Sequence, residues 1–380
     1  MREKSLGQKI ISVVTVFCYV FTIGAGLFYF TFKTEIDRIY DVGAVIKAQY
    51  LHDVPLNQLL KGAVRGMVES LGDPYSAFMD AREYEALQEY IQGAFGGIGI
   101  YVEINKDNLL TVSSPIEGTP AYREGIKSGD VIIKIDDVFT SDLAYDEAVA
   151  RMRGEPGTAV TLGIMRPGVT GLMEFKIIRE IIDIPTVEHQ ILEDEIGYMR
   201  LKIFSSNSDE AVLEHLRALN EAGAKALVLD LRDNPGGDLD SAVNIADFFI
   251  SEGPIVYIVN RSGDTRAYAA AEPEKFGLPL AVLINGGSAS ASEVLSGAIK
   301  DTGAGVLIGE KTFGKGIVQG VFNLGRGEGL KLTTSKYLTP NKIDIHQKGI
   351  EPDIVVTVSE NDREDVQLES ALEYLRKQLE

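Results

Sequence analysis

The fold of the second half is decided by the stretch LAVLINGGSASASE at residues 280–293. Its first five residues are all apolar, as expected for a strand that is covered on both faces of a parallel sheet. The glycines that follow predict a tight turn, and the residues from Glu293 onward predict a helix. A second, largely apolar run at residues 226–231, also followed by a glycine turn, repeats this arrangement. The sequence therefore predicts an α/β fold from about residue 181 onward.

Serine and lysine residues in this half suggest a chemistry. Ser288, Ser290 and Ser292 lie between the predicted strand and helix, where capping of the helix would by itself explain each of them. Lys315 lies in GEKTFGKGIVQ at residues 309–319, between glycines in a mostly apolar setting. A desolvated lysine can be neutral and take a proton from a serine. The four histidines lie in ordinary contexts, so the chain is first interpreted as a Ser–Lys hydrolase.

Composition narrows the class of protein. The 380 residues are 45% hydrophobic and 24% charged, which is typical of a folded chain with two or three domains. A net charge of −19 argues against a nucleic-acid partner. No cluster of histidine, cysteine and aspartate has the spacing of a metal site, and no glycine turn has the lysine of a phosphate loop. We therefore expect no metal and no cofactor.

The N-terminal region predicts a membrane anchor. No charged residue occurs from Ile10 to Phe32, and a helix of this length, about 34 Å, would cross the hydrocarbon core. Arg2, Lys4 and Lys9 precede it, which favours a cytoplasmic N-terminus and a single-pass protein of the cell membrane with the remaining chain on the extracytoplasmic side. The alternative is a cleaved signal peptide, although bulky apolar residues continue beyond the small residues at 24–26.

The changes in pattern along the chain suggest five parts. We predict a cytoplasmic tip and anchor at 1–33, a helical arm at 34–92, a β-rich domain at 93–180, an α/β body at 181–358 and a charged C-terminal helix at 359–380. The arm has apolar residues at helical spacing but cannot bury them alone. It is expected to pack on the body or on a second copy of the chain.

The β-rich domain resembles a PDZ domain. GIGI at 97–100 is followed at suitable distances by Pro120-Ala121, Gly125-Ile126 and Gly129-Asp130, and then by a strand. In PDZ domains a glycine-containing loop holds the terminal carboxylate of a peptide, which adds as a strand beside a helix. The resemblance implies that Ile98, Gly99 and Ile100 form this loop. The alternative is that the glycines only permit unusual backbone angles in a packing module.

The whole ectodomain resembles the carboxy-terminal processing proteases, also called tail-specific proteases. The matching motifs are residues 285–298, GEKTFGKGIVQ at 309–319, DLRDNPGG at 230–237 and KGIEPD at 348–353. The resemblance implies a crotonase- or Clp-like α/β serine protease core. It also implies Ser290 as nucleophile, Lys315 as general base and Gln319 as the residue that orients the lysine amine. Lys311 is the competing lysine, but it lacks the glycine neighbours.

The oxyanion of an acyl-transfer reaction needs fixed hydrogen-bond donors. The N–H of Ala291, at the predicted helix start, is one candidate. The turn at Gly236-Gly237 is the expected source of the other, and the sequence favours Gly236 only slightly.

The sequence thus predicts a membrane-anchored serine endopeptidase that cleaves near the C-termini of exported proteins. Its substrates would be proteins or peptides with free apolar C-termini, captured by the PDZ-like domain. A homodimer formed through the arm is also implied by the resemblance. The rival hypothesis is a peptide-binding scaffold without catalysis. A crotonase-like acyl-CoA enzyme shares related architecture, but no segment resembles a nucleotide pocket.

Overall fold

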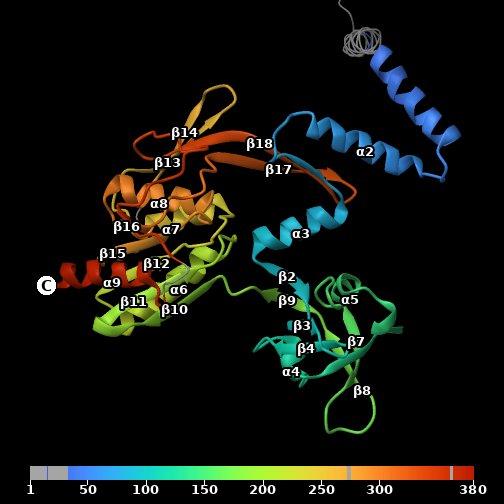
Figure 1. Cartoon of the computed structure of the whole chain (residues 1–380), viewed down its shortest axis with the longest axis horizontal. Coiled ribbons are helices and arrows are strands. Elements are labelled where there is room, and N and C mark those ends of the chain that lie inside the picture. Colours follow the sequence, from blue (N-terminus) through green and yellow to red (C-terminus); the bar gives the residue numbers. More distant parts are fainter. Residues whose placement is uncertain (1–14, 16–32, 272–274, 360–362) are drawn as a thin grey trace, which may run out of the picture. The chain divides into compact units, whose positions relative to one another are not determined.

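The computed structural model describes residues 15, 33–271, 275–359 and 363–380, and Figure 1 shows the chain. The chain divides into two compact units, residues 1–78 and 79–380. In the first unit, residues 33–49 form one helix and α2 (Leu56–Glu69) forms another. Both helices expose large apolar side chains, including Ile39, Leu56 and Leu60. The arm is therefore helical, as its periodicity predicts.

The predicted membrane segment at residues 10–32 lies outside the described residues, except for residue 15. Within the part of the chain that is described, no helix is both long and apolar enough to cross a bilayer. The membrane anchor therefore remains a prediction from the sequence.

The second unit starts with a well-capped helix. Strand β1 (Ala77–Met79) crosses the boundary between the units and leads to α3 (Ala81–Gln92). Asp80 accepts hydrogen bonds from two backbone N–H groups of the first turn of α3, and Glu83 accepts one from the N–H of Asp80. This capping box fixes the start of α3. Gly93, in the left-handed conformation, ends the helix.

A β-rich part follows at residues 94–183. Its sheet has the strand order β3-β4-β5-β7-β8, with β6 paired to β5, while β2 and β9 form a separate ribbon. Buried apolar side chains from the strands and from α4 and α5 form its own core. The elements are β2 (Ala94–Gly97), β3 (Ile100–Ile104), β4 (Leu110–Pro115), α4 (Pro120–Arg123), β5 (Val131–Ile135), β6 (Val138–Phe139), η1 (Thr140–Asp142), α5 (Tyr145–Met152), β7 (Ala159–Met165), β8 (Met173–Ile178) and β9 (Glu180–Asp183).

The α/β body is built on a six-stranded sheet of order β10-β11-β12-β15-β16-β19. The pairs from β11 to β19 are parallel, and β10 is an antiparallel edge strand. The predicted strands at 226–231 and 280–284 are β12 and β15, so the α/β prediction is confirmed. The sheet elements are β10 (Val187–Ile191), η2 (Glu193–Glu195), β11 (Ile196–Leu201), α6 (Ser208–Glu221), β12 (Ala226–Asp230), α7 (Leu239–Asp247), β15 (Leu280–Ile284), α8 (Ala291–Thr302), β16 (Val306–Gly309), β19 (Ile354–Val355) and α9 (Val366–Leu379).

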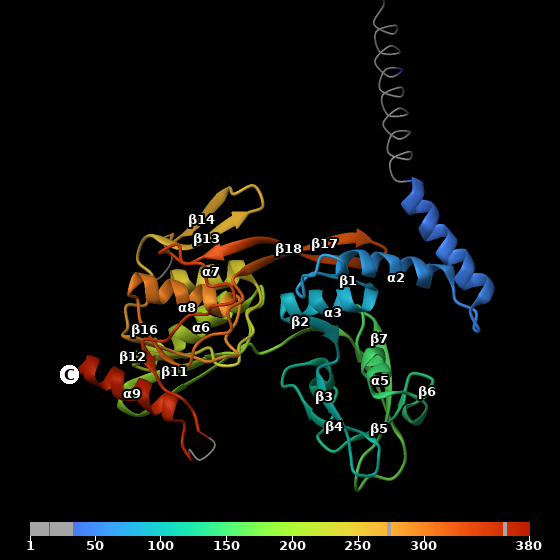
Figure 2. The ribbon, with the colours of Figure 1, turned by 45° about the horizontal axis from the view of Figure 1, so that its top comes forward.

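Helices cover both faces of this sheet. On one face, alternate strand residues such as Leu227 and Val282 pack with α6, α7 and α8 in a large cluster. On the other face, Val228 and Leu283 pack with Ala371 of α9. Figure 2 shows α9 lying apart from α7 and α8 across the strands. Burial on both faces explains why β12 and β15 are largely apolar.

A second sheet of the body contains a long hairpin that the sequence analysis did not single out. Strands β17 (Ile317–Gly325) and β18 (Glu328–Leu338) pair along most of their length, and β18 also pairs with β13 (Pro254–Asn260), which pairs with β14 (Thr265–Ala269). Gly329 of β18 lies against α3, where an added Cβ would meet the ring of Tyr84 at 2.1 Å. The hairpin follows Lys315 directly, so it determines where that lysine lies.

Candidate active site

Only one of the three serines at the start of α8 lines a cavity. Ser288 is fully buried and its hydroxyl donates to the carbonyl of Leu231 at 2.7 Å. Ser292 is also fully buried and donates to the carbonyl of Asn234 at 2.8 Å. Ser290 is half-buried and lines a cavity of about 300 Å³. Ser288 and Ser292 therefore have structural partners, whereas Ser290 lies at a site where a ligand could reach it.

The backbone of Ser290 is strained. Its φ angle is 54° and its ψ angle is −112°, immediately before the first turn of α8. Non-glycine residues in such regions are held there by their surroundings, at a cost of about 1–3 kcal/mol. The N–H of Ser290 donates to Glu293 Oε2 at 2.9 Å, which helps to hold this conformation.

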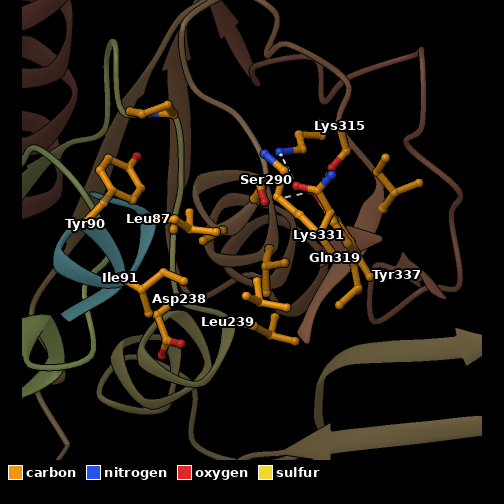
Figure 3. A pocket seen from close by; sticks show the side chains of 17 residues that line it. Leu87, Tyr90, Ile91, Asp238, Leu239, Ser290, Lys315, Gln319, Lys331 and Tyr337 are labelled. Carbon is orange, nitrogen blue, oxygen red and sulfur yellow. Dashed lines mark hydrogen bonds between the residues drawn. The ribbon is translucent and has the colours of Figure 1, made fainter. Parts of the chain in front are cut away.

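Lys315 and Gln319 line the same cavity. Lys315 follows Gly314 at the end of a loop, and Gln319 lies four residues later in β17. The Nζ atom of Lys315 donates to Oε1 of Gln319 at 3.3 Å. Figure 3 shows their side chains with Ser290 at one end of the cavity. Lys311, the competing lysine, is half-exposed, pairs with Glu351 at 2.9 Å and does not line the cavity.

A buried carboxylate joins the serine turn to the lysine loop. Glu293 has no exposed surface. Its Oε2 accepts from the N–H of Lys315 at 2.8 Å as well as from that of Ser290, and its Oε1 accepts from Thr312 Oγ1 and the N–H of Gly314, both at 2.7 Å. The sequence motifs alone did not indicate a role for Glu293 in the site. Its position three residues after Ser290 has the spacing of a capping box, which could have drawn attention to it.

Tyr337 adds a second link between the two segments. Its hydroxyl lies 3.0 Å from the carbonyl oxygen of Ser290 and 2.7 Å from that of Lys315. Burial, together with the nearby charge of Glu293, raises the pKa of Tyr337 well above its usual value. The phenol therefore stays neutral and can donate a hydrogen bond. Tyr337 was not anticipated, because β18 is distant in the sequence from α8.

The two candidate oxyanion glycines have different environments. The N–H of Gly236 donates to Oδ1 of Asn234 at 2.9 Å, so it already has an acceptor. Gly237, with φ of 140°, lines the cavity together with Ala291. A Cβ on Gly236 would lie 2.8 Å from the Ser290 Cβ, which shows how closely the turn approaches the serine. The geometry thus favours Gly237 over Gly236 as a donor to a molecule in the cavity.

The wall opposite the serine comes partly from α3. Leu87, Tyr90 and Ile91 line the cavity, and Figure 3 shows them facing it from that helix. Burial raises the pKa of Tyr90, so this phenol is neutral at physiological pH. The sequence pattern predicts only a helical arm for these residues and no role in the site. None of the four histidines lines the cavity.

The predicted carboxylate loop lies at the start of β3, away from the cavity-lining residues. Ile98 is 3% exposed and its carbonyl accepts from the N–H of Ala121 at 2.9 Å, so its side chain belongs to the domain core. Gly99 has a φ of 78°, and an added Cβ would lie 2.3 Å from the side chain of Thr119. Ile100 begins β3. Only the backbone of this loop is therefore in a position to bind a carboxylate.

Comparison with known proteins identifies matching families for three segments. Residues 195–356 match peptidase family S41, residues 91–165 match the PDZ domain and residues 23–83 match the N-terminal domain of the activating protease CtpB. The first two matches fall on the α/β body and on the β-rich part with its loop at 98–100.

Curated relatives match most of the chain. The carboxyl-terminal-processing protease of Synechocystis sp. is 40% identical over 299 residues, covering 77% of this chain and 70% of the relative. The carboxy-terminal-processing protease of Bartonella bacilliformis is 40% identical over 335 residues, covering 86% and 76%. The carboxy-terminal processing protease CtpA of Bacillus subtilis is 36% identical over 325 residues, covering 85% and 69%.

Proposed function

Because this chain belongs to the carboxy-terminal processing proteases of peptidase family S41, which are serine-type peptidases, we propose that Ser290 is its nucleophile and Lys315 its general base. The observation that carries this proposal is the shared cavity. Ser290, Lys315 and Gln319 all line it, while Ser288, Ser292 and Lys311 have partners elsewhere.

The proposed mechanism is acyl transfer. Ser290 Oγ attacks the carbonyl carbon of the scissile peptide bond while its proton passes to the neutral amine of Lys315. The resulting ammonium then gives the proton to the departing amine, and water releases the acyl group by the reverse sequence. Gln319 holds the lysine amine through its carbonyl oxygen. Because that oxygen carries no full charge, it orients the amine without strongly favouring the ammonium form.

The oxyanion that forms on the substrate would accept from two backbone N–H groups. We assign these to Ala291, at the start of α8, and to Gly237. The assignment replaces Gly236, because the Gly236 N–H is directed to Asn234. Donors fixed in advance stabilise charge that develops only in the transition state.

The PDZ domain is proposed to deliver the substrate. Strand β3 lies at the end of the strand order of its sheet, so one of its edges is open to an added strand among the described elements. A free carboxylate would bind the backbone N–H groups of residues 98–100, and the apolar tail would lie between β3 and α5. The segment at residues 10–32 is proposed to anchor the protein in the cell membrane with the protease on the outer side, since it carries no charge.

The test compares single variants on one peptide that ends in apolar residues with a free carboxylate. Ser290→Ala and Lys315→Met should each lower kcat/KM at least about a thousandfold while the peptide still binds. Lys311→Met is the matched control and should keep wild-type activity, because Lys311 is a half-exposed surface residue. Normal cleavage by either site variant would refute the assignment. Binding without any turnover by the wild-type chain would favour the scaffold hypothesis.

A further inference from the structure

A tyrosine lies across the open edge of the proposed peptide groove. Tyr145 is the first residue of α5, and its hydroxyl donates to the carbonyl of Val102 in β3 at 3.0 Å. The two residues are 43 positions apart in the chain. The bond therefore spans the space between the edge strand and the helix, where an added strand would lie.

The backbone of Val102 faces the open edge of the sheet. Val102 is opposite Val112 in the register of β3 and β4. Val112 donates its N–H to Asp130 and accepts from Gly129, so both of its polar backbone groups point away from β3. Val102 and Val112 therefore form a non-hydrogen-bonded pair of the antiparallel ladder. In such a pair the N–H and C=O groups of each residue point away from the partner strand. The Val102 carbonyl is therefore one that an added strand would use.

The position of Val102 relative to the carboxylate loop decides which part of a peptide it meets. Outward-facing groups recur every second residue along a strand, so Ile100 and Val102 form the first two contact points after the loop. A peptide that runs antiparallel to β3 with its carboxylate at residues 98–100 would place its last residue at Ile100. Its third residue from the end would then need the carbonyl of Val102.

We propose that Tyr145 is a displaceable latch that competes with the substrate tail for the carbonyl of Val102; the inference rests on the proposed capture of peptides by this domain. Tyr145 is 44% exposed, so its side chain can turn toward solvent. When a peptide N–H takes the carbonyl, the phenol exchanges this bond for one to water. A tail bound over three or more residues releases the latch, whereas a shorter one does not reach it.

The latch also lies next to a second cavity. Tyr145 helps to line a space of about 370 Å³ with Ile104 at the end of β3, Leu143 and Phe139. This cavity lies beyond Val102 along the strand, on the side away from the carboxylate loop. When Tyr145 is displaced, a tail bound at the carboxylate loop can therefore extend along β3 and place its upstream side chains in this second cavity.

The experiment measures binding of a fluorescent peptide, with apolar terminal residues and a free carboxylate, to the full chain carrying Ser290→Ala. Adding Tyr145→Phe removes the competing hydroxyl and keeps the ring, so the peptide should bind about two- to tenfold more tightly, the effect of one hydrogen bond. Tyr101→Phe is the matched control. Tyr101 lies in β3, the strand that contains Val102, and is 55% exposed. Its change to phenylalanine should leave the Kd of the peptide unaltered.

Two outcomes would overturn the inference in different ways. The Ser290→Ala chain, which is the parent, is also measured with the same peptide carrying an amidated C-terminus. If the parent prefers the free C-terminus but Tyr145→Phe leaves binding unchanged or weaker, the latch alone is refuted. A parent that binds both peptides equally would refute the capture of C-termini, and the latch with it. Catalysis by Ser290 and Lys315 is tested separately and is affected by neither result.

Discussion

The carboxylate of Glu293 accepts a hydrogen bond from the backbone N–H of Lys315 at 2.8 Å, although 22 residues separate them. The same Oε2 atom accepts from the N–H of Ser290. One fully buried anion thus fixes both segments that carry the proposed nucleophile and base. Such a carboxylate is stable in the interior because its lone pairs are used by four donors.

Glu293→Gln should lower both stability and activity. The amide nitrogen would face N–H or O–H donors in place of one carboxylate oxygen, which leaves buried donors without acceptors. We expect a loss of about 3 kcal/mol in the free energy of unfolding and at least a hundredfold fall in kcat/KM. Urea unfolding and peptide cleavage measure these effects. The exposed Glu252→Gln is the control, and an equally small effect of both changes would contradict the role of Glu293.

Gln319→Glu should move the pH dependence of cleavage. A carboxylate next to the Lys315 amine would favour the ammonium form and so raise the pKa of Lys315. Because a lysine acts as a base only when neutral, the acidic limb of kcat/KM should move to higher pH, by about one to two pH units. Gln319→Met adds no charge and should reduce the rate without this displacement. A pH profile of Gln319→Glu identical to wild type would argue against Lys315 as the base.

Gly237→Ala should destabilise the protein far more than the same substitution at a glycine that has free space around it. The added Cβ would lie 1.9 Å from the carbonyl oxygen of Phe204, and the φ angle of 140° is unfavourable for alanine. We expect a loss of at least about 3 kcal/mol. Gly223→Ala, with φ of 87° and no atom within 4 Å, should lose only about 1–2 kcal/mol. Urea denaturation of the two variants gives the comparison, and similar losses would contradict it.

The attachment of α9 should weaken in acid. The Arg232 guanidinium, through its hydrogen bonds, lowers the pKa of Asp365, which lies at the start of α9. A carboxyl group with a lowered pKa contributes stability above its unfolded pKa of about 4, and this contribution is lost as the pH falls through the lower folded value. Because the Asp365 side chain is 41% exposed, the effect should be small.

Asp365→Asn separates the effect of the Asp365 charge from that of its N-cap hydrogen bond to α9. Asparagine can still accept from the N–H of Leu368, as Asp365 does at 3.1 Å, but it cannot titrate. In the wild type, the protection of α9 amides against hydrogen exchange, taken relative to their intrinsic rate at each pH, should fall between about pH 4 and pH 3, and in this variant that loss of protection should be absent. An unchanged pH dependence in the variant would assign the acid sensitivity to another group.

Several features of the fold follow from local sequence pattern. The largely apolar runs at 226–231 and 280–284 predict buried strands because a strand covered on both faces buries the side chains that point to either side. The hairpin β17–β18 was not anticipated. Many of its residues are half-buried, so neither alternation nor a continuous apolar run marks it clearly.

The sequence by itself determined the residue types of the proposed chemistry, since serine, lysine and glutamine occur in short motifs at fixed spacing. The tertiary structure decided which hydroxyl faces the cavity, because Ser288 and Ser292 are bonded to segments more than 50 residues away. It also decided that Gly236 rather than Gly237 donates to Asn234, and that Glu293 and Tyr337 join the serine turn to the lysine loop. These outcomes depend on hydrogen-bond directions and on contacts between distant segments, which a linear pattern does not contain.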